Sequence, residues 1–151
     1  MDVNLTDEQQ MMVDSAREFL RDACPLATVR DWEKLPDRYP REIWARMAEM
    51  GWTGAIYPEA FGGLGLTNLD MALLMREMGR VALPSPILST VLLAGRAVLE
   101  GGSEAHKQAL LPKIAAGEML LSFALTEASA QPDAATVRTS ARAADDGYVL
   151  N

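Results

Sequence analysis

The spacing of the hydrophobic residues changes near residue 118, and this change limits the folds that the chain can adopt. Before it, apolar residues recur at intervals of three and four, which places them on one side of a helix. After it, apolar and polar residues alternate from Val137 to Ala143, a spacing typical of a strand. Helices followed by strands predict a mainly α chain, in which a helical bundle precedes the first strands of a sheet.

The helical part contains five predicted helices, and each has a recognisable start. Residues that cap or open helices mark these starts: Thr6, Pro40, Thr67, Ser85 with Pro86, and Ser103. Prolines and glycines mark most of the ends: Pro25, Gly51, Gly101 and Pro112. Residues 25–40 carry three prolines and no sustained periodicity, so we predict a connector between the first two helices.

Two later segments have the character of strands. Residues 119–125 form a short apolar run, and Asp-Asp-Gly at residues 145–147 predicts a hairpin turn into residues 148–150. The sequence stops at Asn151, inside the second strand of that hairpin, and a lone hairpin is only marginally stable in water. We therefore expect a sheet that is begun but incomplete.

Length and composition fit this division. With 151 residues and 49% hydrophobic content, the chain can bury one core and still hold a fragment of a second domain. We predict an N-terminal helical domain over residues 1–117 and the start of a β-domain over residues 118–151.

Net charge, hydrophobic run lengths and cysteine content limit the classes of partner and the cellular compartment that we expect. The formal net charge of -7 opposes binding to nucleic acid, whose phosphates attract basic surfaces. No apolar run reaches the about 20 residues needed to cross a bilayer, so we expect no membrane partner. Cys24 is the only cysteine, which excludes an intramolecular disulfide and suits a reducing compartment. We expect a cytoplasmic protein.

Neither a phosphate-binding loop nor a metal site is predicted. The loop PEAFGGLG at residues 58–65 lacks the residue order of a P-loop or a dinucleotide fingerprint, so we interpret it as a tight turn. The single His106 has no second ligand at a suitable spacing. The remaining candidate ligands lie in separate turns: Glu127, Asp133, Asp145 and Asp146.

The stretch FALTE, residues 123–127, carries more chemical information. It closes a predicted strand with an aromatic side chain, a hydroxyl and a carboxylate. Taken alone, it is also consistent with an ordinary strand end. Its functional interpretation therefore depends on the pattern of the whole chain.

In order and spacing, the segments resemble the acyl-CoA dehydrogenase family over essentially the whole chain. LTDEQQMMVDSAREFL is similar to the family's opening helix, and EIWARMAEMGWTGAIYPEAFGGLGL is similar to its second helix and its PE-x-x-GG-x-G loop. From HKQALLPKIAAGEMLLSFALTE onward, the chain resembles the passage into the flavin-binding β-domain, with the LP-x-x-x-x-GE and ALTE landmarks.

The resemblance implies a fold and an activity. In the family, a helical domain, a β-domain and a C-terminal four-helix domain hold FAD and an acyl-CoA thioester between them, and the thioester undergoes α,β-dehydrogenation in fatty acid metabolism. The catalytic base belongs to the C-terminal domain, so the resemblance assigns no catalytic residue to this chain. It assigns flavin contacts to Phe123, Leu125 and Thr126.

The resemblance also has implications for partners. It implies an acyl-CoA substrate, a homo- or hetero-oligomer, and an acceptor of the electron-transfer flavoprotein type. A related flavin oxidase or monooxygenase on the same fold is an alternative, because fold alone does not fix the chemistry.

One departure from the family pattern leaves a second alternative open. The family continues TEP-x-x-GSD, whereas Gln131 and Pro132 stand where glycine and serine are expected. Proline offers neither an N–H group nor a side-chain donor to a ligand. The chain is therefore either a dehydrogenase with altered ligand contacts or a non-catalytic subunit that supports an active partner.

Overall fold

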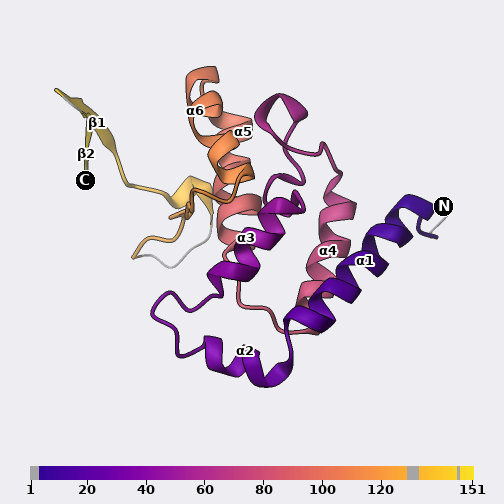
Figure 1. Ribbon diagram of the computed structural model, residues 1–151. Helices are drawn as coiled ribbons and strands as arrows, with labels where there is room; N and C mark the ends of the chain where they lie inside the picture. Colours follow the sequence, from indigo (N-terminus) through magenta and orange to yellow (C-terminus); the bar gives the residue numbers. More distant parts are fainter. Residues whose placement is uncertain (1–3, 129–132, 146) are drawn as a thin grey trace.

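The computed structural model describes residues 4–128, 133–145 and 147–151. Helices pack into one bundle and a hairpin stands apart from it (Figure 1), which confirms the predicted mainly α fold. The α-helices are α1 (Asp7–Ala23), α2 (Leu26–Trp32), α3 (Arg41–Glu49), α4 (Asn68–Arg80), α5 (Arg96–Gly101) and α6 (Glu104–Ala115). The 3-10 helices are η1 (Trp52–Gly54), η2 (Glu59–Phe61) and η4 (Ala134–Thr136), and η3 (Leu88–Gly95) is a π-helix.

The capping residues confirm two of the predicted helix starts and link them. Thr6 accepts a hydrogen bond from the Gln9 amide at 3.2 Å, and Gln9 accepts one from the Thr6 amide at 3.1 Å. Thr67 and Asp70 form the same reciprocal pair at the start of α4. The side-chain amide of Gln9 (Nε2) also donates a hydrogen bond to the Asp70 carboxylate at 2.7 Å. The two capping boxes therefore fix the amino ends of α1 and α4 side by side.

The predicted connector between the first two helices is partly wrong. Pro25 does not only end α1, because it is also the N-cap residue of α2. A proline at a helix start loses no hydrogen bond, since the first N–H groups of a helix have no partner in the helix. Val29 is buried and Trp32 packs against the core, so tertiary contacts stabilise a helix that is too short to show a clear periodicity.

The boundaries of the last helices also differ from the prediction. Ile87, rather than Ser85, is the N-cap residue of η3, and no side chain caps this start. Pro112, near which the last helix was predicted to end, lies inside α6, and the helix continues to Ala115. Leu111, Ile114 and Ala115 around it are buried, and their packing offsets the backbone hydrogen bond that proline cannot make. The cap at Ser103, which accepts from the His106 amide, is as predicted.

Residues 57–66 form the tight turn that the glycines predict. A Cβ atom at Gly63 would lie 2.0 Å from the Tyr57 carbonyl oxygen, so only glycine fits there. This turn holds Tyr57 fully buried, with its hydroxyl donating to the Val91 carbonyl at 3.0 Å. Through this hydrogen bond, the turn is fixed to the π-helix η3.

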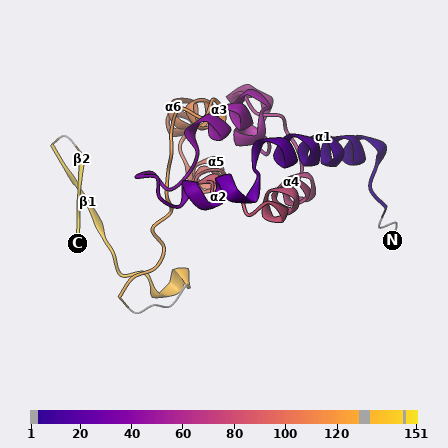
Figure 2. The same ribbon diagram turned by 60° about the horizontal axis from the view of Figure 1, so that its bottom comes forward.

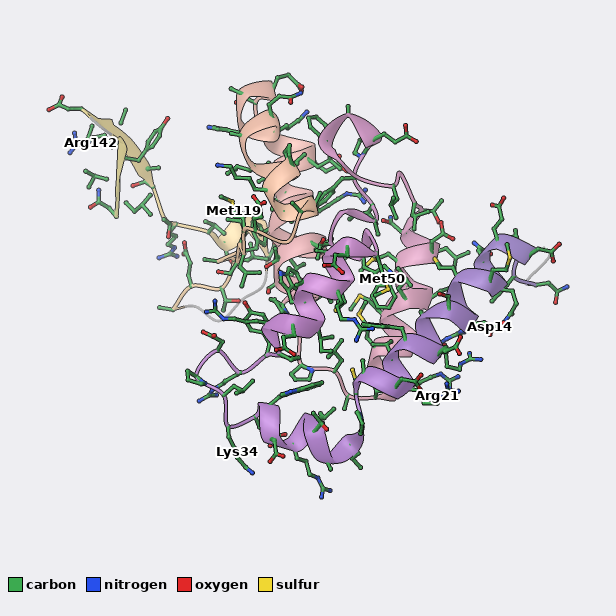
Figure 3. All side chains as sticks on the ribbon, in the orientation of Figure 1. Asp14, Arg21, Lys34, Met50, Met119 and Arg142 are labelled. Carbon is green, nitrogen blue, oxygen red and sulfur yellow. The ribbon has the colours of Figure 1, made fainter. Side chains whose placement is uncertain are left out.

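The hairpin confirms part of the predicted sheet. β1 (Ala141–Ala144) pairs antiparallel with β2 (Gly147–Leu150), and Ala141 faces Leu150. All residues of these strands whose exposure is described are exposed, and the hairpin points away from the helices in both views (Figures 1 and 2). In Figure 3, Met50 lies among the helices, whereas Arg142 lies out on the hairpin.

The strand predicted at residues 119–125 is absent. These residues carry no strand pairing, because the described part of the chain offers no neighbouring strand to them. A strand is defined by its partner, so an apolar run alone cannot form one. The chain is irregular here, and side chains of the helices replace the missing partner.

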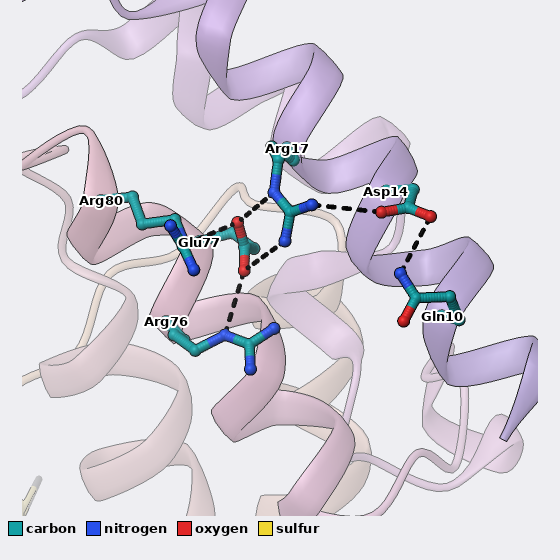
Figure 4. Close-up of polar contacts among 6 residues, drawn as sticks. All are labelled: Gln10, Asp14, Arg17, Arg76, Glu77 and Arg80. Carbon is teal, nitrogen blue, oxygen red and sulfur yellow. Dashed lines mark hydrogen bonds and ion pairs between the residues drawn. The ribbon is translucent and has the colours of Figure 1, made fainter. Parts of the chain in front are cut away.

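A buried carboxylate joins α1 to α4 (Figure 4). Glu77 is 1% exposed and accepts hydrogen bonds from Arg17 at 3.0 and 3.3 Å and from Arg76 at 3.0 Å, while Arg80 lies 3.1 Å away. The hydrogen bond from Arg17 is the main cause that holds the pKa of Glu77 below its ordinary value of 4.5. Three guanidinium groups thus compensate one buried charge between α1 and α4.

A second carboxylate, that of Glu127, binds the main chain just before the hairpin. Glu127 accepts hydrogen bonds from the amides of Arg138 at 2.9 Å and Thr139 at 2.8 Å, and from the Thr139 hydroxyl. Donation from the Thr139 hydroxyl, followed by the two amides, holds the pKa of Glu127 below its ordinary value of 4.5. The charged form of Glu127 therefore fixes where the hairpin begins.

We expect Glu77→Gln to lower the free energy of unfolding by about 2 kcal/mol, because the neutral amide cannot accept from three cations and the half-exposed arginines only partly regain water. Urea unfolding measures the loss. Glu100→Gln is the matched control, since Glu100 pairs with Arg96 at an exposed site and should lose less than about 1 kcal/mol. Equal losses would contradict the role of Glu77.

We expect the loop contacts of Glu127 to depend on pH. Because the folded pKa is lowered, the contribution is complete above the ordinary value of 4.5 and is lost as the pH falls through the folded pKa. Amide chemical shifts of Arg138 and Thr139 should move together in an NMR titration through this range. Glu127→Gln should abolish that movement, and its persistence would assign it to another group.

Candidate functional site

The main chain that leaves α6 is held to the helices by three side chains. The Thr53 hydroxyl donates to the Ala115 carbonyl at 2.6 Å, and the Trp44 indole donates to the Gly117 carbonyl at 2.9 Å. Further along, the Thr90 hydroxyl donates to the Leu121 carbonyl at 2.9 Å and accepts from the Leu121 amide at 3.2 Å. These bonds satisfy polar main-chain groups that have no sheet partner.

Gly117 gives a physical reason for the GE landmark. Its φ is +73°, and a Cβ atom there would lie 2.7 Å from Ala48 and 3.3 Å from the Trp44 indole nitrogen. Only glycine lets the chain turn this close to α3. The turn directs the following residues along the side of the bundle toward the predicted flavin contacts.

The structure brings the three predicted flavin contacts onto one irregular stretch, which we call the 123–126 strip. Phe123 is 47% exposed, Leu125 is half-buried and Thr126 is exposed. The Leu125 amide donates to the Phe123 carbonyl at 3.2 Å. Within the described part of the chain, the Thr126 hydroxyl makes no hydrogen bond. The strip therefore presents an aromatic ring, an aliphatic group and a free hydroxyl together.

An apolar hollow of about 470 Å³ borders the start of this strip. It lies between α5, α6 and the segment that follows them, and its walls are Ala94, Ala97, Val98, Gly101, Gly102, His106, Leu110, Leu121, Ser122 and Phe123. The volume is within the range of small-molecule sites. His106, for which the sequence offered no second metal ligand, is exposed and also borders the hollow.

These groups are of the kinds that would suit one edge of a flavin ring. A threonine hydroxyl both donates and accepts, as the pyrimidine edge of the ring requires, and apolar neighbours suit the ring face. No residue of a pyrophosphate site is assigned. Gln131 and Pro132, whose effect on ligand binding the sequence left open, lie outside the described residues.

Other chemistries find little support in the described residues. No three of their His, Cys, Asp and Glu side chains lie close enough to hold a metal ion. Cys24 is buried, and burial raises the pKa of its thiol, which disfavours the reactive thiolate. None of the described helices has the length and hydrophobicity of a membrane span.

Curated relatives match nearly the whole chain. The acryloyl-CoA reductase (NADH) of Anaerotignum propionicum is 37% identical over 100% of this chain and 39% of its own length. The (2S)-methylsuccinyl-CoA dehydrogenase of Cereibacter sphaeroides is 34% identical over 97% of this chain and 27% of its own length. The chain thus spans well under half of the relatives that it matches.

Solved structures share the fold. A glutaryl-coenzyme A dehydrogenase in complex with glutaryl-CoA superposes with a TM-score of 0.84 at 29% identity, covering 100% of this chain and 39% of that one. An acyl-CoA dehydrogenase from Bacillus anthracis complexed with FAD gives 0.82 at 29% identity, covering 98% and 26%. The ChsE4-ChsE5 complex from Mycobacterium tuberculosis gives 0.82 at 25% identity, covering 99% and 40%.

The sequence profile of the "Acyl-CoA dehydrogenase, N-terminal domain" matches residues 6–118, which include helices α1 to α6. This match, the fold and the relatives confirm the resemblance found in the sequence. The chain belongs to the acyl-CoA dehydrogenase family, whose N-terminal domain it contains.

Proposed function

We propose that this chain supplies the helical domain and one flavin-facing segment of an FAD-dependent oxidoreductase that acts on the α,β-bond of an acyl-CoA thioester. The observation that carries the proposal is the 123–126 strip, whose exposed Phe123 borders an apolar hollow and whose exposed Thr126 hydroxyl makes no hydrogen bond within the described residues. Membership of the family supports it, as do relatives whose names specify acyl-CoA reductases and dehydrogenases.

In this reaction the chain's own residues bind and orient. When bound, FAD would supply the hydride acceptor for the β-carbon. Thr126 would hydrogen-bond one edge of the ring, while Phe123 and Leu125 would exclude water beside it. The hollow next to Phe123 would take an apolar group of the ligand. We assign no catalytic residue to this chain, because the family's base belongs to another domain.

We further propose a cytoplasmic oligomer with an acceptor of the electron-transfer flavoprotein type. Support for an oligomer comes from the similarity to the ChsE4-ChsE5 complex and from two exposed leucines of η3, Leu88 at 51% and Leu93 at 46%. Apolar side chains at this exposure suit a contact with another domain or subunit.

The same leucines favour a second candidate, a non-catalytic subunit that supports an active partner. This candidate predicts that the protein purifies with a flavin-bearing partner at one flavin for two subunits. The first candidate predicts one flavin for each copy of this chain. Quantified flavin absorbance against subunit content separates the two, and a flavin oxidase would be recognised by hydrogen peroxide release.

We expect Thr126→Ala to weaken flavin retention in the full-length gene product about tenfold, since one hydrogen bond is lost and little else changes. Dialysis followed by absorbance spectroscopy measures the retained flavin. Thr28→Ala is the control, because Thr28 is also exposed but lies on α2.

Equal flavin occupancy in the Thr126→Ala and unsubstituted proteins would remove Thr126 from the site. The whole proposal would be falsified if the full-length product, alone and mixed with candidate partners, never showed flavin absorbance.

A further inference from the structure

Thr90 makes an unusual pair of hydrogen bonds. Its side chain is completely buried on the π-helix η3, and its single hydroxyl both donates to and accepts from the main chain of Leu121. The two residues are 31 positions apart. In a sheet, a neighbouring strand would supply this donor and this acceptor. Here one hydroxyl supplies both.

The position of this contact along the chain sets its importance. The bonds from Thr53 and Trp44 end at Ala115 and Gly117, inside or directly after α6. The Thr90 contact at Leu121 is the last of the three before the 123–126 strip. Leu121 and Phe123 both border the apolar hollow. Any shift of Leu121 would therefore move the strip relative to α5 and α6.

The surroundings of Thr90 hold it in a fixed orientation. The Tyr57 hydroxyl donates to the carbonyl of Val91, the next residue of the π-helix. A Cβ atom at Gly95 would lie 1.8 Å from the Tyr57 hydroxyl oxygen, so the wide turn needs glycine there. Burial raises the pKa of Tyr57, which keeps the hydroxyl protonated as a donor. Short π-helical turns of this kind are frequent at functional sites.

We propose that Thr90 is a positioning residue: its hydroxyl fixes the 123–126 strip against η3 and so sets the orientation of the flavin that the strip contacts. The flavin part of this inference rests on the proposed function, whereas the contact between Thr90 and Leu121 does not. If Thr90 were only a satisfied core threonine, its loss would lower stability and change nothing specific to the strip.

The first experiment measures hydrogen exchange at the Leu121 amide in the chain itself. Thr90→Val removes the hydroxyl with little change in shape and should speed this exchange about tenfold, the effect of losing one hydrogen bond. Thr90→Ser retains a hydroxyl and should restore slow exchange. Should Thr90→Val be too unstable to measure, Thr90→Cys, with a weak donor, should give an intermediate rate.

Thr53→Val is the matched control for both experiments. Thr53 is also completely buried and its hydroxyl also donates to a main-chain carbonyl, but at Ala115, before the strip. It should lower stability by an amount similar to that of Thr90→Val and leave the Leu121 amide slow relative to global unfolding. Unchanged exchange in Thr90→Val would overturn the proposal.

The second experiment uses the flavin-loaded full-length product. Thr90→Val should raise the flavin dissociation constant about tenfold and shift the visible absorbance bands, Thr90→Ser should restore both, and Thr53→Val should change neither. Equal effects of the two valine variants would reduce Thr90 to a structural role. Absence of flavin from the unsubstituted protein would overturn the proposed function and the flavin part of this inference, while exchange at Leu121 would still decide whether the contact exists.

Discussion

The main chain that leaves α6 must satisfy its polar groups without a neighbouring strand, and the rest of the site depends on how it does so. Trp44, Thr53 and Thr90 supply these partners from α3, η1 and η3. An unpaired main-chain group costs about as much free energy as a lost hydrogen bond when it is buried. The helical bundle is therefore the template that directs the segment after Gly117.

This arrangement explains why the π-helix lies where it does. The glycine-rich turn at residues 57–66 places Tyr57 in the buried core. Its hydroxyl there needs a hydrogen-bond acceptor and room for its oxygen atom. The Val91 carbonyl provides the acceptor and Gly95 provides the space. A side chain from one loop thus shapes the helix that carries Thr90. The turn glycines act sterically, and their effect reaches the π-helix that carries Thr90 through Tyr57.

Local signals in the sequence predicted local structure. The capping boxes at Thr6 and Thr67 were recognisable because the partner lies three residues away. The helix α2 was not recognisable, because distant packing stabilises it. For the site, resemblance to a family indicated Phe123, Leu125 and Thr126. The contact of Thr90 with Leu121 spans 31 residues and leaves only a faint signal, a threonine within a mainly apolar helix.

The contrast in burial along the chain shows that two different segments close the core and present the 123–126 strip. Leu111 and Ile114 of α6 are completely buried, so the bundle closes its core without any contribution from the hairpin. A few residues later, Phe123 is 47% exposed although its ring could gain by burial. The helices therefore stabilise themselves, and they hold the strip outside the core by hydrogen bonds instead of apolar packing. The exposed ring of Phe123 beside an apolar hollow is the kind of surface that the proposed ligand contact requires.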